Sequence, residues 1–518
     1  MHDAKPAPGK AAPGNPKLPA ALNALWIGGD ASLDENTAAR AFELLTGAVT
    51  LASSLWPEFY EGVGVARLVH SAAAPPPPEI VAAALRHGVA LAPGEFTTES
   101  GAEQCDLALA ASSAVADVAD DLPILTASPD GGNAVIAITG GASPLLSGAR
   151  RWTLLAGTVS SSDIARAILS PPRTFRETTK LRDYQNEDMR AKVRRFAYDV
   201  LLRLIGEKSA KAEPDHSWSV VAALADKAGP ARAAAIAALR AEYERADAQA
   251  LAYGQRWRST LATRAFMLLL GSVVSGLVGT LFPRLVIVTI PIQVIATVLI
   301  FADRRFATRR RWREKWLEYR HLAESVRLAR FCLLADAPFP RTDSAYWPDW
   351  RLRRAIRSVP PAGAVREEQA SAVLDHLRNV EIADQIAYHH AAFRRFRRLD
   401  ARLKRAASFA LFATVALGAV FAVLALTGAG RTVPLTSALS LALSAAPSLY
   451  AALDSLRSQL DVTRQAQRSG RIAAGLRRLA RELSNAPPSA VLARAAALHA
   501  ASIMGEDVTS WERVIGVV

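Results

Sequence analysis

Residues 265–302 read AFMLLLGSVVSGLVGTLFPRLVIVTIPIQVIATVLIFA, and residues 406–453 read AASFALFATVALGAVFAVLALTGAGRTVPLTSALSLALSAAPSLYAAL. Each stretch consists of two apolar arms without Asp, Glu, Lys or Arg, at residues 265–282 and 285–302 and at residues 406–427 and 435–453. Arms of about 18 or more apolar residues come close to the length that crosses about 30 Å of hydrocarbon. The sequence therefore predicts two transmembrane hairpins, with four transmembrane helices in all.

Clusters of basic residues lie on both sides of each hairpin. Basic residues near the ends of transmembrane helices remain in the cytoplasm. Both hairpins are therefore expected to enter from the cytoplasm and return to it, which places both termini and all the long segments of this multi-pass protein there. The basic positions are 256, 258, 264, 304–305, 309–311 and 313 around the first hairpin, and 394–395, 397–398, 402, 404–405, 457, 464, 468 and 471 around the second.

The chain has 518 residues, a formal net charge of +14 and a pI near 10.1. Because many of its arginines lie beside the predicted spans, we assign this charge to anionic lipid head groups and to membrane topology. The sequence has no nucleic-acid-binding motif, so membrane lipid, and not nucleic acid, is the expected partner. The two cysteines, Cys105 and Cys332, agree with a reducing compartment.

The rest of the sequence divides into segments of distinct pattern. Residues 21–170 alternate short β-like runs with helical ones, which predicts a Rossmann-like α/β domain after a disordered leader at residues 1–20. Amphipathic helices flank both hairpins, so two units of helix, transmembrane hairpin and helix are expected at residues 230–337 and 365–486. A helical linker at residues 171–229, a second linker rich in Pro and Trp at 338–364 and a helical tail at 487–518 complete the predicted order.

Polar side chains form a stripe on the returning arm of each hairpin, at spacings of three or four residues that share one face of a helix. Two interpretations remain open, namely hydrogen bonds between helices in a closed bundle, or the neutral wall of an oligomeric pore. Small residues on the first arm predict a face for close helix packing. The stripe residues are Thr289, Gln293, Thr297, Ser437, Ser440, Ser444 and Ser448, and the packing residues are Gly271, Ser275 and Gly279.

The sequence lacks the motifs of common nucleotide-dependent and metal-dependent enzymes. It contains no phosphate-binding P-loop, no Cys/His cluster with metal-ligand spacing and no Gly-x-Ser-x-Gly nucleophile motif. We therefore expect no catalytic residue, no metal site, no resident cofactor and no enzyme activity. The absence of ionisable residues within the arms also argues against a proton-coupled transporter.

Three strings beside the hairpins resemble the SLATT family of two-span membrane effectors. RADAQALAY at residues 245–253 and WLEYRHLAESVR at residues 316–327 stand on either side of the first hairpin. DQIAYH at residues 384–389 precedes the second hairpin and resembles the entry helix of another SLATT subgroup. The chain is thus similar to two SLATT units in tandem.

This resemblance implies a membrane effector of a bacterial conflict or antiphage defence system, located in the inner membrane. Such effectors are expected to form homo-oligomers and to permeabilise that membrane when a sensor protein or domain detects a nucleotide second messenger. The amino-terminal region is similar to a SLOG domain, a Rossmann-like nucleotide sensor. On this resemblance Gly28, Gly29 and Asp30 follow the first strand and are the candidate ligand-binding residues, with a nucleotide as the candidate ligand.

An alternative interpretation is a membrane scaffold or interaction protein without a pore. In that case the amino-terminal domain is a degenerate nucleotide-binding fold, since its glycine turn is reduced to two residues. The two hypotheses differ in whether polar side chains of the hairpins are required for ion leakage.

Overall fold

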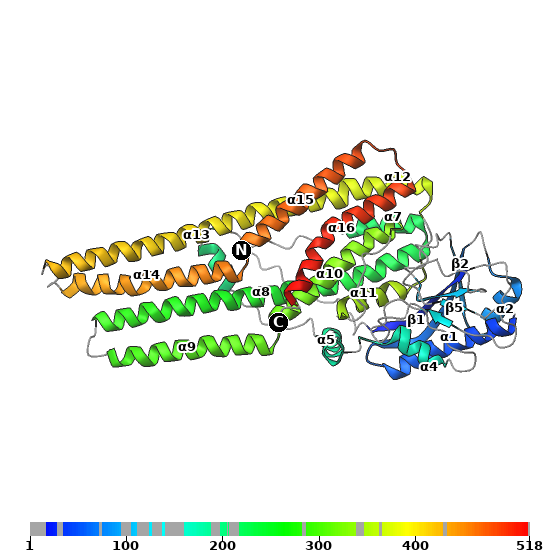
Figure 1. Ribbon diagram of the computed structural model, residues 1–518, viewed down its shortest axis with the longest axis horizontal. Helices are drawn as coiled ribbons and strands as arrows, with labels where there is room; N and C mark the ends of the chain where they lie inside the picture. The colour runs from blue at the N-terminus through cyan, green and yellow to red at the C-terminus, as the bar shows by residue number, and fades with distance from the viewer. Residues whose placement is uncertain are drawn as a thin grey trace, which may run out of the picture.

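In the computed structural model, a sheet lies at one end of an elongated molecule and two helical hairpins lie at the other (Figure 1). Long helices in the middle connect these ends. The structure describes residues 17–27, 35–71, 75–94, 105–110, 124–126, 137–139, 160–172, 174–187, 197–204, 206, 217–281, 286–337, 346–361, 365–427 and 433–515.

The sheet has six strands in the order β3-β2-β1-β4-β5-β6. All neighbouring strands are parallel except β5 and β6. This order matches that of doubly wound nucleotide-binding folds and confirms the α/β character predicted for this region. The strands are β1 (Leu18–Ile27), β2 (Tyr60–Ser71), β3 (Ala90–Gly94), β4 (Leu107–Ala110), β5 (Ile124–Thr126) and β6 (Ala137–Thr139).

The start of the sheet corrects one predicted boundary. Strand β1 begins at Leu18, inside the leader that we predicted to extend to residue 20. Ala20 and Leu22 are fully buried, and Leu18 pairs with Tyr60 of β2. The Ala- and Pro-rich composition of the leader concealed this strand, because its apolar alternation begins only near Leu18.

The two faces of the sheet differ in polarity, since successive side chains of a strand point to opposite faces. Helix α1 (Glu35–Leu55) packs on the face that carries Leu22 and Ala66. Its Val49 lies so close to Gly64 that a Cβ there would overlap the valine side chain. The opposite face carries Asn23, and helix α11 (Trp347–Arg357) covers it. The short helices α2 (Pro78–Arg86) and α4 (Ser161–Ile164) and the π-helix η2 (Ala165–Leu169) complete this end of the molecule.

The helical region contains the same order of elements twice. In each unit a long helix leads into the hairpin, a second helix returns, and an exit helix folds back onto the amino-terminal part of the first. The first unit comprises α8 (Pro230–Leu281), α9 (Val286–Arg309) and α10 (Trp312–Leu334), and the second comprises α13 (Ala383–Leu426), α14 (Val433–Gln459) and α15 (Val462–Ser484).

The turn between the returning helix and the exit helix is the same in both units. Its central residue is left-handed, with φ 52° and ψ 36° at Arg311 and φ 49° and ψ 39° at Asp461. The amide of each bonds to the carbonyl three residues earlier, and its carbonyl accepts from the amide four residues later. Non-glycine residues seldom adopt this conformation, so its recurrence supports the internal repetition inferred from the sequence.

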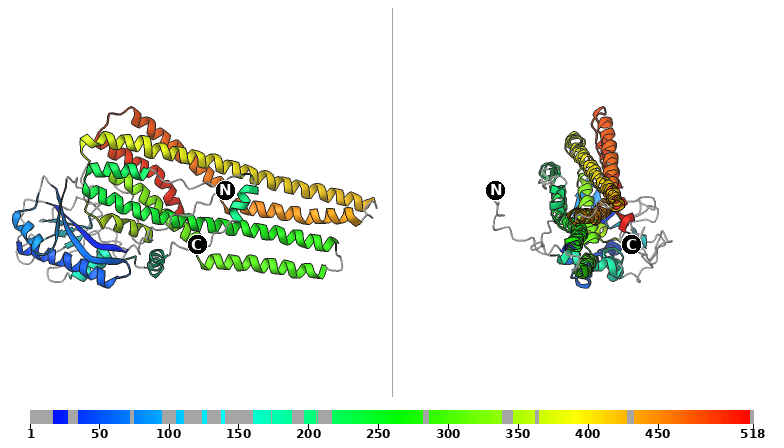
Figure 2. Two further views of the ribbon diagram at one scale, coloured as in Figure 1. Left: turned by 180° about the vertical axis from the view of Figure 1, so that it is seen from behind. Right: turned by 90° about the vertical axis from the view of Figure 1, so that its left-hand side faces the viewer.

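The hairpin helices lie in a row, in the order α9, α8, α14 and α13 (Figures 1 and 2). Among the described residues, two helical stretches are long and apolar enough to cross a membrane, where the sequence predicted four. They belong to α8 and α13, and only 28% and 11% of their most apolar windows are buried. Core helices of a soluble protein would be mostly buried, so these surfaces suit lipid better than water.

The predicted linkers contain ordered helices. The segment at residues 338–364 includes α11, whose Trp347 and Arg351 are fully buried. Its interpretation as a linker between the two halves is therefore wrong for the described part. The other connecting helices are α5 (Phe175–Asn186), α6 (Ala197–Leu204), α7 (Ser217–Ala228), α12 (Glu367–His376), the π-helix η4 (Leu377–Ile382) and α16 (Ala490–Ile515).

The α/β domain and the first unit share one apolar core. Its largest cluster of buried residues includes Leu22 of β1, Phe42 of α1, Leu239 of α8, Leu322 of α10 and Trp347 of α11. A second cluster joins the end of α10 to η4, α15 and α16. The amino-terminal domain is consequently not packed as an independent unit.

We predict an acid-sensitive contact where α10 meets the second unit. Arg330 Nη2 lies 2.7 Å from Glu381 Oε2, and His376 Nε2 lies 3.3 Å from the other oxygen. Burial alone would raise the pKa of Glu381. Arg330 and His376 lower the pKa by more than burial raises it, so that it falls from 4.5 to about 2. A carboxyl with a lower pKa in the folded state stabilises that state above its unfolded pKa, and the contribution disappears as the pH falls through the folded value.

The stability of the wild type should therefore fall between about pH 4.5 and pH 2, and that of Glu381→Gln should fall less over this window. Denaturant unfolding of the detergent-solubilised chain at a series of pH values measures both. An identical pH dependence for the two proteins would contradict this assignment.

Candidate functional site: a chain of buried ion pairs from the sheet to the first hairpin

The predicted ligand-binding residues Gly28, Gly29 and Asp30 lie outside the described residues. The strand that precedes them, β1, ends at Ile27 and pairs with β4, which ends at Ala110. The strand order reverses between these two neighbours. In open α/β sheets, ligands bind at such a switch point beyond the carboxyl ends of the strands.

The polar stripe of α9 does not face its neighbour in the hairpin. Gln293 and Thr297 are exposed, and the Thr297 hydroxyl donates to the Gln293 carbonyl at 2.8 Å. Ala296 instead faces α8, since a Cβ at Gly271 would lie 3.4 Å from the Ala296 Cβ. Within one chain, Gln293 and Thr297 are therefore exposed while Ala296 approaches α8, and both interpretations of the stripe stay predictions.

The other predicted hairpin residues are placed only in part. Gly271 and Ser275 lie on the packing side of α8, and the Ser275 side chain is buried. Ser448 is half-buried on α14. The side chains of Thr289, Ser437, Ser440 and Ser444, and Gly279, lie outside the described residues, although the helices that carry them are described.

The polar contacts that connect the two ends of the molecule begin at Asp106. This residue immediately precedes β4 and is buried on the face of the sheet that α11 covers. Arg354 of α11 forms an ion pair with its carboxylate, and Arg357 Nη1 lies 3.1 Å from the same oxygen. Burial raises the pKa of Asp106, but the two arginines and the Asn23 amide outweigh it and hold the pKa below its usual value. Asp106 is thus a buried anion that requires α11.

Further contacts hold α11 against the sheet. The Asn23 amide group donates to the Arg357 carbonyl at 3.2 Å, and Arg67 donates to the Ser358 carbonyl at 3.2 Å. The Trp350 indole donates to the Ser170 carbonyl at 2.9 Å. Helix α11 therefore occupies the position of a covering helix of the α/β domain, although it comes from between the two helical units.

Arg351 continues the chain of ion pairs from α11 to α8. Its guanidinium makes two bonds to the Glu242 carboxylate, of 3.0 Å from Nε and 2.8 Å from Nη2. Arg351 has no exposed side-chain surface, and Tyr184 of α5 donates to Glu242 at 2.8 Å. A bidentate, buried pair of this kind fixes the relative orientation of the two helices more strictly than apolar contact does.

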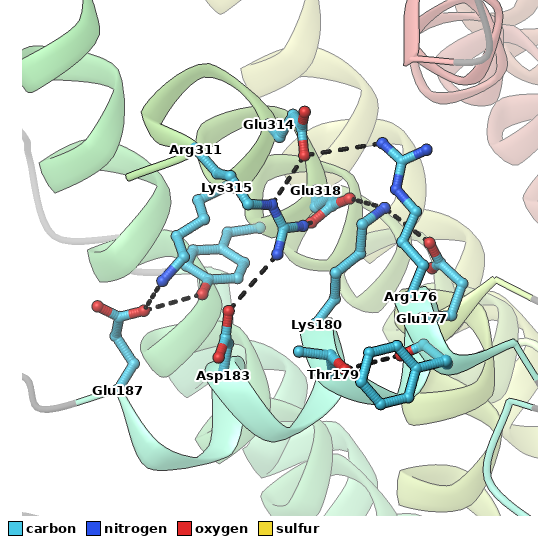
Figure 3. Close-up of polar contacts among 12 residues, drawn as sticks. Arg176, Glu177, Thr179, Lys180, Asp183, Glu187, Arg311, Glu314, Lys315 and Glu318 are labelled. Atoms are coloured by element: carbon cyan, nitrogen blue, oxygen red, sulfur yellow. Dashed lines mark hydrogen bonds and ion pairs between the residues drawn. The ribbon is translucent and has the colours of Figure 1, made fainter. Parts of the chain in front are cut away.

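Helix α5 extends the contacts to the turn between α9 and α10, at the end of the first hairpin (Figure 3). Arg311, the left-handed residue of this turn, lies 3.5 Å from Asp183 of α5. It also lies 2.9 Å from Glu314 and 3.8 Å from Glu318. We refer to these contacts between α5 and the turn as the charged joint.

Lys180 and Glu318 form the interior of the charged joint. Lys180 Nζ lies 2.6 Å from Glu318 and 2.6 Å from Glu177, and the Glu318 side chain is only 1% exposed. Burial raises the pKa of Glu318 despite the nearby Lys180 and Arg311. The buried Glu318 carboxyl is therefore protonated more readily than a solvent-exposed glutamate.

Glu187, the residue directly after α5, contacts α10. Glu187 lies 2.8 Å from Lys315 and accepts a hydrogen bond of 3.1 Å from Tyr319. Tyr253 of α8 also donates to Glu187. The charged joint thus connects α5 to both α8 and α10 of the first unit.

The corresponding turn of the second unit lacks such a surrounding among the described residues. Asp461 pairs with Arg464 at 3.8 Å, and both side chains are at least half exposed. An exposed pair of this type contributes about 0–1 kcal/mol. Among the described residues, only the first of the two equivalent turns contacts α5.

The comparisons with known proteins found no match among protein-family models, curated proteins or solved structures. The site must therefore be interpreted from its geometry. Sequence reasoning missed α11, although Trp347, Trp350, Arg351 and Arg354 follow the three- and four-residue spacing of one helix face. Asp247 of α8 and Glu324 of α10 both form ion pairs with Arg320.

Replacement of Asp106 tests the importance of this chain of contacts. Asp106→Asn leaves Arg354 and Arg357 buried without their carboxylate, which should reduce the free energy of unfolding by about 3–5 kcal/mol. The control is Glu58→Gln, which removes an exposed pair with Arg182 and should cost about 0–1 kcal/mol. Denaturant unfolding at neutral pH measures both, and similar costs for the two variants would refute the proposed role of Asp106.

Proposed function

We propose that this chain is a four-span protein of the bacterial inner membrane, in which a cytoplasmic sensor-like α/β domain controls an oligomeric module that permeabilises the membrane. The observation that carries the proposal is the exposure of the apolar hairpins. Phe409, Phe412 and Val415 of α13 are 72%, 71% and 66% exposed, and Ile290 and Ile295 of α9 are 61% and 58% exposed. Side chains of this kind require lipid or a second chain around them.

The returning helices α9 and α14 complete the four spans of this proposal. Their apolar arms, at residues 285–302 and 435–453, carry no Asp, Glu, Lys or Arg. The basic residues at their ends favour a cytoplasmic location for the turn between α9 and α10 and for the turn between α14 and α15. Four helices in a row leave no enclosed channel within one chain, so a pore requires several chains.

The exposed polar stripe of α9 supports this assembly. Gln293 and Thr297 are polar side chains in an apolar arm, and they are exposed to whatever surrounds the hairpin. A neutral amide and a hydroxyl are costly against lipid but suitable for a water-filled wall or for contact with another chain.

The charged joint provides a physical connection from the α/β domain to this hairpin. A ligand that shifts β1, β4 or α11 would act on Asp106, on Arg351 and Glu242, and finally on the turn at Arg311. A role in defence against phage rests on the resemblance to SLATT effectors, and a nucleotide at the switch point between β1 and β4 would be the trigger. Because α11 belongs to the core of the α/β domain, nucleotide binding should be measured by calorimetry on the full chain.

We predict that Gln293 is needed for leakage. Gln293→Leu removes the polar group and should reduce the release of carboxyfluorescein from proteoliposomes and the loss of membrane potential on expression in bacteria. Val298→Leu is the matched control, since Val298 is also exposed on the same helix and stays apolar. If the wild type releases no dye from vesicles and leaves the membrane potential intact under phage challenge, the pore hypothesis is wrong. A protein that still binds its partners in that case would be a membrane scaffold.

We predict that the charged joint restrains the first hairpin. Arg311→Gly retains a left-handed turn but removes the ion pairs to Asp183 and Glu318, so it should increase dye release. Asp461→Gly makes the same backbone change in the second unit, where α5 is absent from the described surroundings, and should leave release near the wild-type level. Equal effects of the two substitutions would show that backbone freedom, and not the joint, controls leakage.

A further inference from the structure

Arg258 occupies a distinctive position between the two helical units. It lies on α8, and its guanidinium carbon is 5.9 Å from the ring centre of Tyr198 on α6 and 5.1 Å from that of Trp316 on α10. Trp316 lies close to α8 here, since a Cβ at Gly254 would come within 2.8 Å of its indole nitrogen. The two aromatic rings therefore fix the plane of the half-buried guanidinium.

Burial, two arginines and two tyrosines act on the charge of Arg258. Burial lowers the pKa of Arg258, and the positive charges of Arg395 on α13 and Arg320 on α10 lower it further. Among the described residues, no carboxylate forms an ion pair with Arg258, whereas Arg320 pairs with Asp247 and Glu324. A guanidinium held between rings and flanked by like charges lacks a neutralising anion from the described part of the chain.

The position along α8 relates this group to the membrane surface. Arg258 precedes the apolar arm at residue 265 by seven residues, which corresponds to about 10 Å along a helix. The pair of Arg264 and Asp303, 3.3 Å apart, lies between Arg258 and the arm. The nearby α6 bears an exposed Leu204 and packs its buried Leu201 and Leu202 with Leu403 of α13. The site thus lies where α6, α8, α10 and α13 meet below the hairpins.

We propose that Arg258, framed by Tyr198 and Trp316, binds the phosphate group of an anionic phospholipid or of a soluble phosphate ester between the two units. The planar guanidinium presents parallel N–H donors that match two phosphate oxygens. A bound phosphate would neutralise the positive charge between α8 and α13 and hold the two units together. The lipid source rests on the proposed membrane function, whereas the soluble source does not.

Arg258→Gln and Arg256→Gln form a matched pair of variants. Arg256 lies on the other side of α8 and is stacked on one ring, that of Tyr253, at 5.2 Å. Each substitution removes one positive charge from the same helix. Arg258→Gln also removes two ring contacts, and Arg256→Gln removes one. Arg258→Lys retains the charge but not the planar fork, so it keeps the test valid if the glutamine variant fails to fold.

The experiment measures the thermal unfolding midpoint of the full-length chain in detergent, with inorganic phosphate or chloride at equal ionic strength, and in nanodiscs with or without phosphatidylglycerol. Phosphate or phosphatidylglycerol should raise the midpoint of the wild type and of Arg256→Gln, but not that of Arg258→Gln. Arg258→Lys should require about tenfold more phosphate for half of the effect, because it loses one charge-assisted bond.

The arms of the experiment distinguish the two sources. A shift with phosphatidylglycerol alone identifies a lipid head group, and a shift with inorganic phosphate identifies a site open to soluble esters. No shift in either arm, or equal shifts in Arg258→Gln and the wild type, would overturn the proposal. Dye release is not used as the readout, so a failed pore and a failed phosphate site give different results.

Discussion

The neutralisation of Asp106 is the constraint on which the arrangement of the molecule depends. A carboxylate buried against a sheet costs several kcal/mol unless cations and hydrogen bonds compensate for it. Here the compensation comes from Arg354 and Arg357, which lie about 250 positions further along the chain. The sheet can therefore reach its described form only with α11 in place, and α11 is in turn bound to α8 through Arg351.

This constraint connects the amino-terminal domain to the first unit more tightly than to the second. The sheet, α8, α10 and α11 share one core, and α5 contacts the turn at Arg311 through Asp183. The second unit repeats the same helices and the same left-handed turn, but at Asp461 the side chain remains exposed. Two units that are equivalent in order of elements are thus inequivalent in their surroundings.

Much of the fold could be predicted because its signals are local. Strand-like runs near Leu25, Val65, Val89 and Ile124 lie within or beside strands of the sheet, since short apolar runs bounded by turn residues favour strands. The long apolar arms likewise indicated helical hairpins. In contrast, α11 was missed because Pro348 lies in its first turn and because arginines occupy its buried face. A buried arginine has no apolar signature when its partners are distant in sequence.

The sequence alone determined the apolar hairpins, the basic residues beside them and the order of the units, because hydropathy and charge are properties of neighbouring residues. It also determined the α/β pattern of the amino-terminal region. Only the tertiary structure decided that Asp106 meets α11, that α5 contacts Arg311, and that Gln293 is exposed. Each of these depends on contacts between residues far apart in the chain, whose geometry follows from packing and from the need to pair buried charges.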